Sequence, residues 1–447
     1  MKTPVRDFID YYRQSGMTRL HMPGHKGHGP LGCEAWDLTE IQGADDLADP
    51  SGILLESENN ATALFGSRHT FYSTGGSSQC IKAMLYLALL HKPAGAAATV
   101  LAGRNAHKAF VHGCALLGLE PVWLWPSQPD GLCTCAVTGE DLERALAAQS
   151  QLPLAVYITA PDYLGTSPDL AALAEVCRHW GVPLLVDNAH GAYLRFLQPS
   201  RHPLDLGAAM CCDSAHKTLP VLTGGAYLHV AKGAACPFEQ DARQALSVFG
   251  SSSPSYLVLA SLDACNAALA GDLPARLAVC ADEMASLKRR LEGQGLPLRL
   301  GEPLKLVIDG AAAGTTGLAL ADRLRAGGVE PEFADEDVLV LMAAADTSRA
   351  DLSKVAQALD GFQPGKPRAP LALPSPGPQA MSLREAMLAP QQKVAVVQAA
   401  GRVCGSTVVS CPPAIPMAMP GECLTEETAA FLERMGMDCI SVVKEVH

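Results

Sequence analysis

Lys217 lies in a turn of small and polar residues, CCDSAHKTLP (residues 211–220), that follows an apolar segment typical of a buried strand. A lysine that is partly buried beside a positively charged ring can lose its proton and form a Schiff base with an aldehyde. Ser214 and His216 share this turn and can donate hydrogen bonds to a phosphate. A lone lysine is usually a solvated surface residue, so other segments decide its interpretation.

Asp187 closes another apolar segment 30 residues earlier, in VDNAHGAYLRF. Ligands of open α/β sheets bind at the carboxyl ends of the strands, where this carboxylate is expected. A carboxylate held against a pyridine nitrogen keeps that nitrogen protonated, and the protonated ring accepts electrons from a breaking bond. Ala189 and His190 follow in the same turn. A turn cap is the alternative interpretation of Asp187.

Two further segments predict an anion cradle and a ring cover. In YSTGGSSQCIKAML, Gly75, Gly76 and Ser77 precede a predicted helix, whose first N–H groups favour phosphate. An ordinary serine N-cap explains the same pattern. In RNAHKAFVHG, His107 lies near a strand end, where an imidazole can lie flat on a pyridine ring; a capping or core histidine is the alternative. Together the four segments supply what pyridoxal phosphate needs.

The elements that must position these residues alternate between short apolar runs and amphipathic helices from about residue 61. This alternation predicts an α/β fold, with a mostly parallel sheet covered by helices on both faces. The expected strands are residues 99–102, 121–124, 154–159, 183–186, 209–212 and 225–230. The expected helices are residues 77–90, 106–117, 139–148 and 170–180.

We expect five regions along the chain. The first contains one helix candidate at residues 5–15 and little later periodicity, and the third repeats a strand–helix–strand pattern. The fourth is so rich in Pro and Gly that it must be a linker or an extended wrap. The regions are an N-terminal arm at 1–60, a large cofactor-binding domain at 61–270, a small α/β domain at 271–362, a linker at 363–380 and a C-terminal segment at 381–447.

The charge balance excludes some partners. The chain has 34 Lys and Arg against 46 Asp and Glu, a formal net charge of −12. Nucleic acid is disfavoured because phosphate backbones are bound by clustered cations. No apolar run reaches the roughly 18 residues of a membrane helix, and Asp7 and Asp10 do not fit a signal peptide. We therefore expect a cytoplasmic protein with no nucleic-acid or membrane partner.

The 15 cysteines and 13 histidines raise the alternative of a metal site or of disulfides. The cysteine count is odd, and no pair has C-x-x-C spacing; the nearest approaches are Cys133 with Cys135 and Cys211 with Cys212. Most cysteines lie among apolar neighbours, where a free thiol behaves as a small hydrophobic group. We expect reduced, buried thiols and no metal.

Taken in this order, the segments resemble the major domain of the Orn/Lys/Arg decarboxylase family, pyridoxal-phosphate enzymes of the aspartate-aminotransferase fold (fold type I). The resemblance covers nearly the whole chain. It includes HMPGHKG at 21–27, DLTEIQGADDLADPSG at 37–52, SSSPSYLVLASLDA at 251–264 and PPAIPMAMPGE at 412–422. It implies a short family member that decarboxylates a basic amino acid to an amine, with a place in polyamine biosynthesis.

The resemblance also implies roles for single residues. Lys217 forms the internal aldimine with pyridoxal 5'-phosphate, Asp187 pairs with the pyridine nitrogen, and His107 stacks on the ring. Lys217 or His216 returns a proton to the substrate carbon. The other cofactor contacts implied are Gly75, Gly76, Ser77, Ala189, His190, Ser214, His216 and Ser252. Ser252 matches a position that reaches the phosphate of the neighbouring subunit, which implies a homodimer or higher homo-oligomer with a shared active site.

Three segments depart from the family pattern. Thr74-Gly75-Gly76-Ser77 stands where Asn-Gly and two hydroxyl residues are common, so one hydroxyl contact is lost. Asn188 and Tyr193 replace a Glu and a His that short members often have, and Gly224 replaces a frequent Gln. These changes leave cofactor binding intact and bear on the substrate.

A basic amino acid needs an anion for the far end of its side chain, and a guanidinium prefers a bidentate carboxylate. Glu422 is the first candidate for this substrate contact, with Asp45 and Asp46 second; a charge at a helix N-terminus is the alternative for Glu422. Arginine is favoured by analogy, and lysine and ornithine stay open. Other open readings are a different pyridoxal-phosphate reaction, such as an aminotransferase or β-eliminating lyase, and a silent regulatory homologue.

Overall fold

The computed structural model describes residues 1–93, 95–127, 134–408 and 415–445. Pro412, in the Pro-rich segment, and Cys133 lie outside the described residues. The chain divides into two compact units. Unit 1 comprises Met1–Gly95, Leu154–Val156 and Leu170–Ala278, and unit 2 comprises Ala96–Pro153, Tyr157–Asp169 and Val279–His447.

The main sheet has seven strands in the order β1-β7-β6-β5-β4-β2-β3. Strands β5 and β6 are parallel, as are β2 and β3, whereas β7 is antiparallel to both β1 and β6. The predicted α/β fold with a mostly parallel sheet is confirmed. The strands are β1 (His69–Ser73), β2 (Thr99–Gly103), β3 (Glu120–Leu124), β4 (Ala155–Thr159), β5 (Leu184–Asp187), β6 (Met210–Asp213) and β7 (Ala226–Val230).

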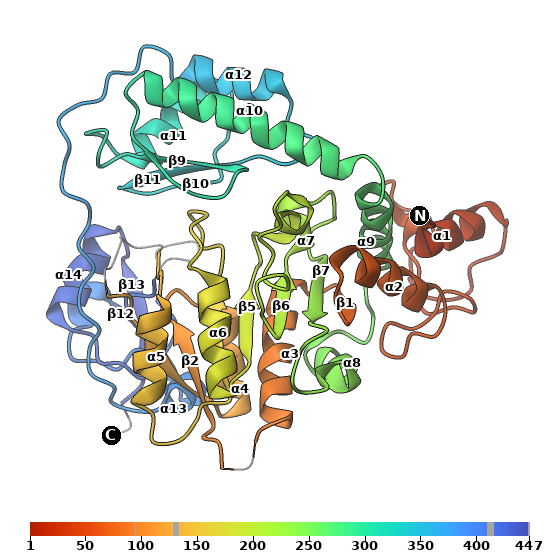
Figure 1. Cartoon of the computed structure of the whole chain (residues 1–447), viewed down its shortest axis with the longest axis horizontal. Helices are drawn as coiled ribbons and strands as arrows, with labels where there is room; N and C mark the ends of the chain where they lie inside the picture. Colours follow the sequence, from red (N-terminus) through yellow and green to blue (C-terminus); the bar gives the residue numbers. More distant parts are fainter. Residues whose placement is uncertain (94, 128–133, 409–414, 446–447) are drawn as a thin grey trace. The chain divides into compact units, whose positions relative to one another are not determined.

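Unit 1 places β1, β7, β6 and β5 side by side, as Figure 1 shows. The parallel register pairs Asp187 with Cys212, so the carboxyl ends of β5 and β6 lie at one edge of the sheet. The helices of unit 1 are α1 (Pro4–Gln14), α2 (Ile53–Phe65), α3 (Gly76–Leu90), α6 (Leu170–Trp180), α7 (Ala215–Thr218), α8 (Phe238–Phe249) and α9 (Tyr256–Leu269). Two short 3₁₀ turns cover Glu34–Trp36 and Ala192–Phe196.

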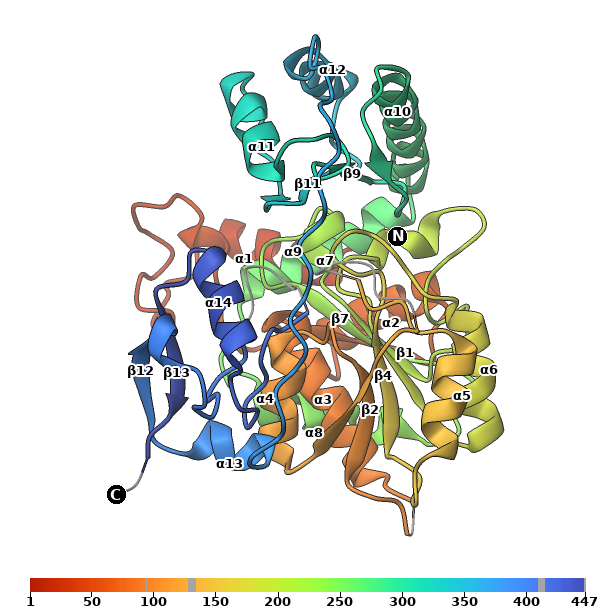
Figure 2. The ribbon, with the colours of Figure 1, turned by 90° about the vertical axis from the view of Figure 1, so that its left-hand side faces the viewer.

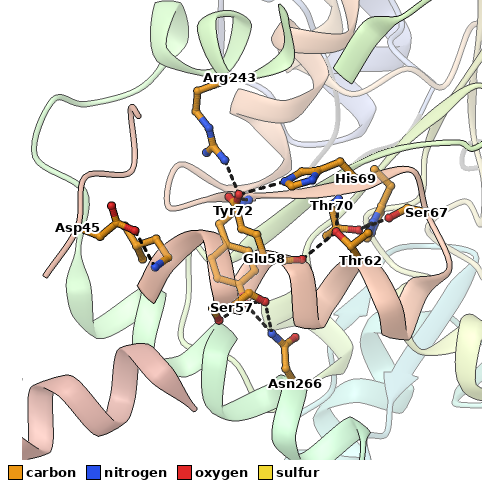
Figure 3. A network of polar contacts seen from close by, with 12 residues as sticks. Asp45, Ser57, Glu58, Thr62, Ser67, His69, Thr70, Tyr72, Arg243 and Asn266 are labelled. Carbon is orange, nitrogen blue, oxygen red and sulfur yellow. Dashed lines mark hydrogen bonds and ion pairs between the residues drawn. The ribbon is translucent and has the colours of Figure 1, made fainter. Parts of the chain in front are cut away.

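Helices α2 and α8 and strand β1 of unit 1 were not predicted from the sequence. Helix α2 begins at Ile53, inside the arm that we expected to lack later periodicity, and strand β1 was not expected. Both carry polar side chains that are buried rather than solvated. Glu58 of α2 accepts the N–H of Tyr72 at 2.8 Å, lies 3.2 Å from Nε2 of His69 and also accepts from Arg243, as Figure 3 shows. Buried polar residues with hydrogen-bond partners interrupt the apolar periodicity from which a strand or helix is predicted.

Unit 2 contains α4 (Lys108–Leu117) and α5 (Gly139–Ala147) beside the strands β2 and β3, and a second sheet of order β10-β11-β9-β8. Most of α10 (Leu273–Gly293), with α11 (Gly317–Ala326) and α12 (Arg349–Ala358), lies on one side of that sheet, as Figure 2 shows. Its strands are β8 (Leu298–Arg299), β9 (Lys305–Asp309), β10 (Phe333–Ala334) and β11 (Val338–Met342).

The C-terminal part of unit 2 pairs β12 (Gln391–Ala395) with β13 (Cys439–Val443) in antiparallel register. It also contains α13 (Leu383–Leu388), a 3₁₀ turn (Val396–Gln398) and α14 (Glu426–Arg434). Arg384 of α13 donates to the carbonyls of Ala115 and Leu116 near the end of α4. This segment therefore packs on the helix that follows β2.

Two features of the described residues concern the earlier expectations about membrane helices and about the cysteines. No single described helix is long and apolar enough to cross a membrane; α9 and α10 pass that test only as a pair, with a bend of 80°. The thiols of the described residues are free, and most are buried. Burial raises the pKa of Cys80 and of Cys177 to about 12, so both stay protonated.

Candidate active site

Lys217 lies on the four-residue helix α7, directly after strand β6. Its Nζ atom is 2.9 Å from Nε2 of His190, which lies on the turn after β5. The side chain of His190 is buried, and Lys217 is half-buried. A neutral imidazole can accept a hydrogen bond from the ammonium group at this distance. The structure thus brings together two residues that the sequence assigned to the same site.

Asp187 is the last residue of β5 and is buried. One carboxylate oxygen, Oδ1, accepts the N–H of Ala189 at 3.1 Å and faces the thiol of Cys212 at 3.8 Å. The carboxylate therefore lies at the strand end, as the sequence predicted. The contact with Ala189 is the turn-capping contact of the alternative interpretation, and the pairing of Asp187 with the ring nitrogen stays a prediction.

The glycine- and serine-rich segment forms the start of α3. Gly76 has a φ of +70°, and a Cβ added there would meet no atom within 4 Å. Ser214 donates to Ser77 at 2.8 Å between the two hydroxyl oxygens, and both residues are buried. These contacts bring the turns after β1 and β6 together beside the first N–H groups of a helix, where anions are favoured.

Gly224 explains one departure from the family pattern. Its carbonyl accepts the N–H of Gly76 at 2.8 Å, and its φ of +97° is rarely adopted by residues with a side chain. A Cβ at this position would lie 3.1 Å from the carbonyl oxygen of Thr74. A Gln at Gly224 would therefore need another backbone conformation, and the glycine closes the loop over the start of α3.

Two other predicted residues of unit 1 lie in different settings. His216 places Nδ1 3.1 Å from the carbonyl oxygen of Gly225, so that nitrogen carries the proton. Ser252 is exposed in the single chain, in the Ser-rich turn before α9. The contact of Ser252 with the phosphate of a neighbouring subunit stays a prediction.

His107 belongs to unit 2, where it caps α4 by accepting the N–H of Ala109 at Nδ1, at 3.2 Å. The capping interpretation of His107 therefore describes its contact within unit 2. That contact leaves the proton on Nε2 and fixes the orientation of the ring. Its role in stacking stays a prediction.

Glu422 takes part in a buried ion pair with Arg104, which follows β2. Nη1 and Nη2 of Arg104 each lie 2.8 Å from one oxygen of the carboxylate, in bidentate geometry. The Arg104 side chain is 0% exposed and the Glu422 side chain 5%. The carboxylate also accepts the N–H of Met419 at 2.9 Å. The guanidinium that this carboxylate holds is thus one of the chain's own, which corrects the expectation that it is offered to a substrate.

The second-choice carboxylates differ from each other. Asp45 accepts four backbone N–H groups, those of Asp46, Ser51, Gly52 and Leu54, at 2.8–3.0 Å. Burial alone would raise the pKa of Asp45, but these hydrogen bonds outweigh it and lower the pKa. Asp45 is therefore used to hold the start of α2. Asp46 is exposed and accepts the N–H of Ala48, so it has capacity left for a ligand.

Sequence reasoning missed two buried charges: Arg104, and Asp213 with its two histidine partners. Both follow or close an apolar strand, which is the signal that selected Asp187. Both lie inside the segments RNAHKAFVHG and CCDSAHKTLP, but neither was selected because the sequence does not show which partners they meet. The partner of Arg104 is distant in sequence, since Arg104 and Glu422 are 318 residues apart, whereas the two histidine partners of Asp213 are 11 and 16 residues away.

The residues of unit 1 fit a pyridoxal-phosphate site. Open space beside Gly76, paired hydroxyls at Ser77 and Ser214, a carboxylate at the end of β5 and a lysine on the next strand-end turn match the phosphate, ring and aldehyde of that cofactor. Fold and site together define the class of pyridoxal-phosphate enzymes with a mostly parallel sheet.

The family comparison narrows this class. The Orn/Lys/Arg decarboxylase major domain matches residues 32–295, more than half of the chain, and the C-terminal domain of the same family matches residues 376–438. The chain belongs to the Orn/Lys/Arg decarboxylase family. It is a pyridoxal-phosphate-dependent amino-acid decarboxylase, as the resemblance implied.

Relatives and solved structures agree with this placement. The arginine decarboxylase of Halalkalibacterium halodurans is 30% identical over 96% of this chain and 93% of that protein. The arginine decarboxylase of Bacillus subtilis is 27% identical over 96% and 93%. The constitutive lysine decarboxylase of Escherichia coli superposes with a TM-score of 0.77 at 18% identity, over 99% of this chain and 82% of that one. This last likeness is one of fold.

Proposed function

We propose that the protein decarboxylates a basic amino acid, with arginine as the preferred substrate, and releases the corresponding amine and carbon dioxide. The pairing of Lys217 with His190 beside Asp187 is the observation that supports the chemistry. The two arginine decarboxylases that match along nearly their whole length support the choice of arginine over lysine and ornithine.

Each residue of the site has a proposed task. Lys217 holds the cofactor covalently, and His190 accepts the lysine proton at Nε2. Asp187 holds a proton on the ring nitrogen, while Gly75, Gly76, Ser77, Ser214 and His216 hold the phosphate. Bound there, pyridoxal phosphate supplies an electron sink for the bond that breaks at the substrate Cα. Lys217, with His216 as the alternative, then returns a proton to that carbon.

The cation at the far end of the substrate needs a carboxylate. We propose Asp46 for this contact, because Asp45 is saturated by backbone N–H groups and Glu422 by Arg104. The net charge of −12 favours the approach of a cationic amino acid at low ionic strength. At 0.1 M salt, the attraction between charges more than about 10 Å apart is largely screened.

A product screen tests the substrate. Purified protein supplied with pyridoxal phosphate is incubated separately with arginine, lysine and ornithine, and amine and carbon dioxide are measured. We expect equal amounts of both products, with the highest kcat/KM for arginine. An oxo acid or pyruvate formed from other amino acids, with no carbon dioxide from these three, would replace the proposal by another reaction type.

We further propose that the active site is shared within a homodimer in the cytoplasm, with Ser252 reaching the neighbouring subunit's phosphate. The exposed position of Ser252 supports this arrangement. Mixing inactive Lys217→Ala and Ser252→Trp proteins should restore part of the activity, since a mixed dimer regains one intact site. Activity that stays absent in subunits shown to have exchanged would contradict sharing.

A further inference from the structure

Four buried polar side chains form a cluster behind the strand ends of unit 1, here named the Asp213 network: Asn188, His202, Asp213 and His229. All four are 0% exposed. Nε2 of His202 and Nε2 of His229 each lie 3.1 Å from Oδ2 of Asp213, and Asn188 donates to Oδ1 at 2.6 Å. One carboxylate thus ties together strand β7, the loop before β6 and the turn after β5.

The contacts of the two histidines with Asp213 show where their protons lie. Nδ1 of His202 accepts the N–H of Leu204 at 3.4 Å, and Nδ1 of His229 lies 2.8 Å from the hydroxyl of Thr70. Because an ionised carboxylate oxygen only accepts, both rings carry a proton on Nε2 and donate that N–H to Asp213. Burial lowers the pKa of His229 despite the pull of Asp213, so this ring is neutral at neutral pH.

A metal ion is the competing interpretation, because ligand atoms of His202, Cys211 and Asp213 lie within 4.8 Å of one another. A metal needs an imidazole lone pair and a thiolate. The contact with Leu204 places the His202 lone pair on the wrong nitrogen. Without a metal, burial raises the pKa of Cys211 well above its ordinary value, so coordination would have to displace the thiol proton. Hydrogen bonding to a carboxylate fits these residues better than coordination.

The network ends at both halves of the proposed site. Asp213 directly precedes Ser214, whose carbonyl accepts the N–H of Lys217 at 3.0 Å. Asn188 directly follows Asp187, and its own N–H donates to the carbonyl of Cys212 at 2.9 Å. A buried carboxylate with three directional donors allows little freedom to the chain on either side. The hydrogen bonds to Asp213 therefore restrict the distance between the turn of Asp187 and the turn of Lys217.

We propose that the Asp213 network is a positioning device that sets the spacing between Asp187 and Lys217 for cofactor binding. This inference rests on the proposed roles of those two residues. It also gives a reason for Asn188, where short family members often have Glu. The amide donates to Asp213, whereas a carboxylate at this position would place a second buried anion against the first.

The test compares Asp213→Asn with Glu58→Gln in the full-length protein. Both substitutions neutralise a buried carboxylate held by a histidine in unit 1, but Glu58 binds His69 and Arg243 on other elements (Figure 3). Cofactor affinity is measured by titrating the cofactor-free protein and following visible absorbance, with thermal unfolding of the cofactor-free protein in parallel. We expect both variants to lose stability, but only Asp213→Asn to bind cofactor roughly 10–100-fold more weakly.

A second pair keeps the test valid if Asp213→Asn fails to fold. His229→Gln retains an N–H group that can reach Asp213, whereas His229→Phe fills the space without a donor. We expect His229→Gln to keep cofactor affinity within a few-fold of the parent protein and His229→Phe to lose it in the same range as Asp213→Asn. The value of kcat should fall with affinity, while KM for the amino acid changes little.

Three results would overturn the proposal. One is cofactor affinity that falls equally in Glu58→Gln and Asp213→Asn, and another is equal affinity in the two His229 variants. The third is a stoichiometric metal in the purified protein that disappears in Asp213→Asn. Failure of the proposed roles of Asp187 and Lys217 is distinguishable, because the parent protein itself would then show no covalently held cofactor.

Discussion

Lys217→Ala is expected to leave the protein without covalently held cofactor and without measurable turnover. The side chain is the one amine of the CCDSAHKTLP turn, and its contact with His190 gives its proton a place to go. Loss of the proton that it returns to the substrate carbon would by itself cost roughly 10²–10⁴-fold in kcat. Visible absorbance after extensive dialysis and amine production from arginine measure the two losses separately.

Lys232→Ala is the matched control for this substitution. Lys232 follows β7 in the same unit and is exposed, so its replacement removes the same charge and the same side-chain length outside the site. We expect the control to keep cofactor and activity within about twofold of the parent protein, as is usual for surface substitutions. Full activity in Lys217→Ala would refute the proposed mechanism.

The ends of strands β5 and β6, which precede the turns of the site, could be predicted from the sequence. Each strand is a short, mostly apolar run, which is typical of a buried strand. β5 and β6 differ from the expected ranges by one residue at each end. The start of α3 was predictable because Gly75 and Gly76 mark the beginning of a long, largely apolar helix pattern. Local pattern and tertiary structure agree in these segments.

Partners across the chain could not be predicted, because hydropathy carries no information about which buried charge meets which. Glu422 was expected to face a substrate, and it meets Arg104 instead. Asp45 was expected as a reserve for the same task, and it holds the backbone at the start of α2. Strand β1 was missed because Thr70 and Ser73 are buried but polar. Each error reflects a hydrogen bond formed only in the folded chain.

The ion pair of Arg104 and Glu422 carries the second large prediction, because removing one partner leaves a buried charge alone. We expect Glu422→Gln to lower the free energy of unfolding by about 3–5 kcal/mol. The guanidinium lies 5.0 Å from the ring centre of Trp123 and 5.4 Å from that of Trp125, which contribute attraction but cannot replace a carboxylate. Chemical denaturation followed by circular dichroism measures the loss.

Glu426→Gln and a double variant separate the ion pair from a substrate contact. Glu426 is exposed at the start of α14, so the same chemical change there should alter stability by less than about 0.5 kcal/mol. Arg104→Met combined with Glu422→Leu removes both charges and should recover most of the lost stability, because a buried pair replaced by apolar groups is often neutral. Stability unchanged in Glu422→Gln, together with a raised KM for arginine, would instead restore Glu422 as the substrate's carboxylate. The expected pattern is the reverse: lower stability, with KM unchanged in the folded fraction. Arg104 lies on the turn between β2 and His107. With KM unchanged, the ion pair of Arg104 and Glu422 would affect catalysis only by holding this turn in place.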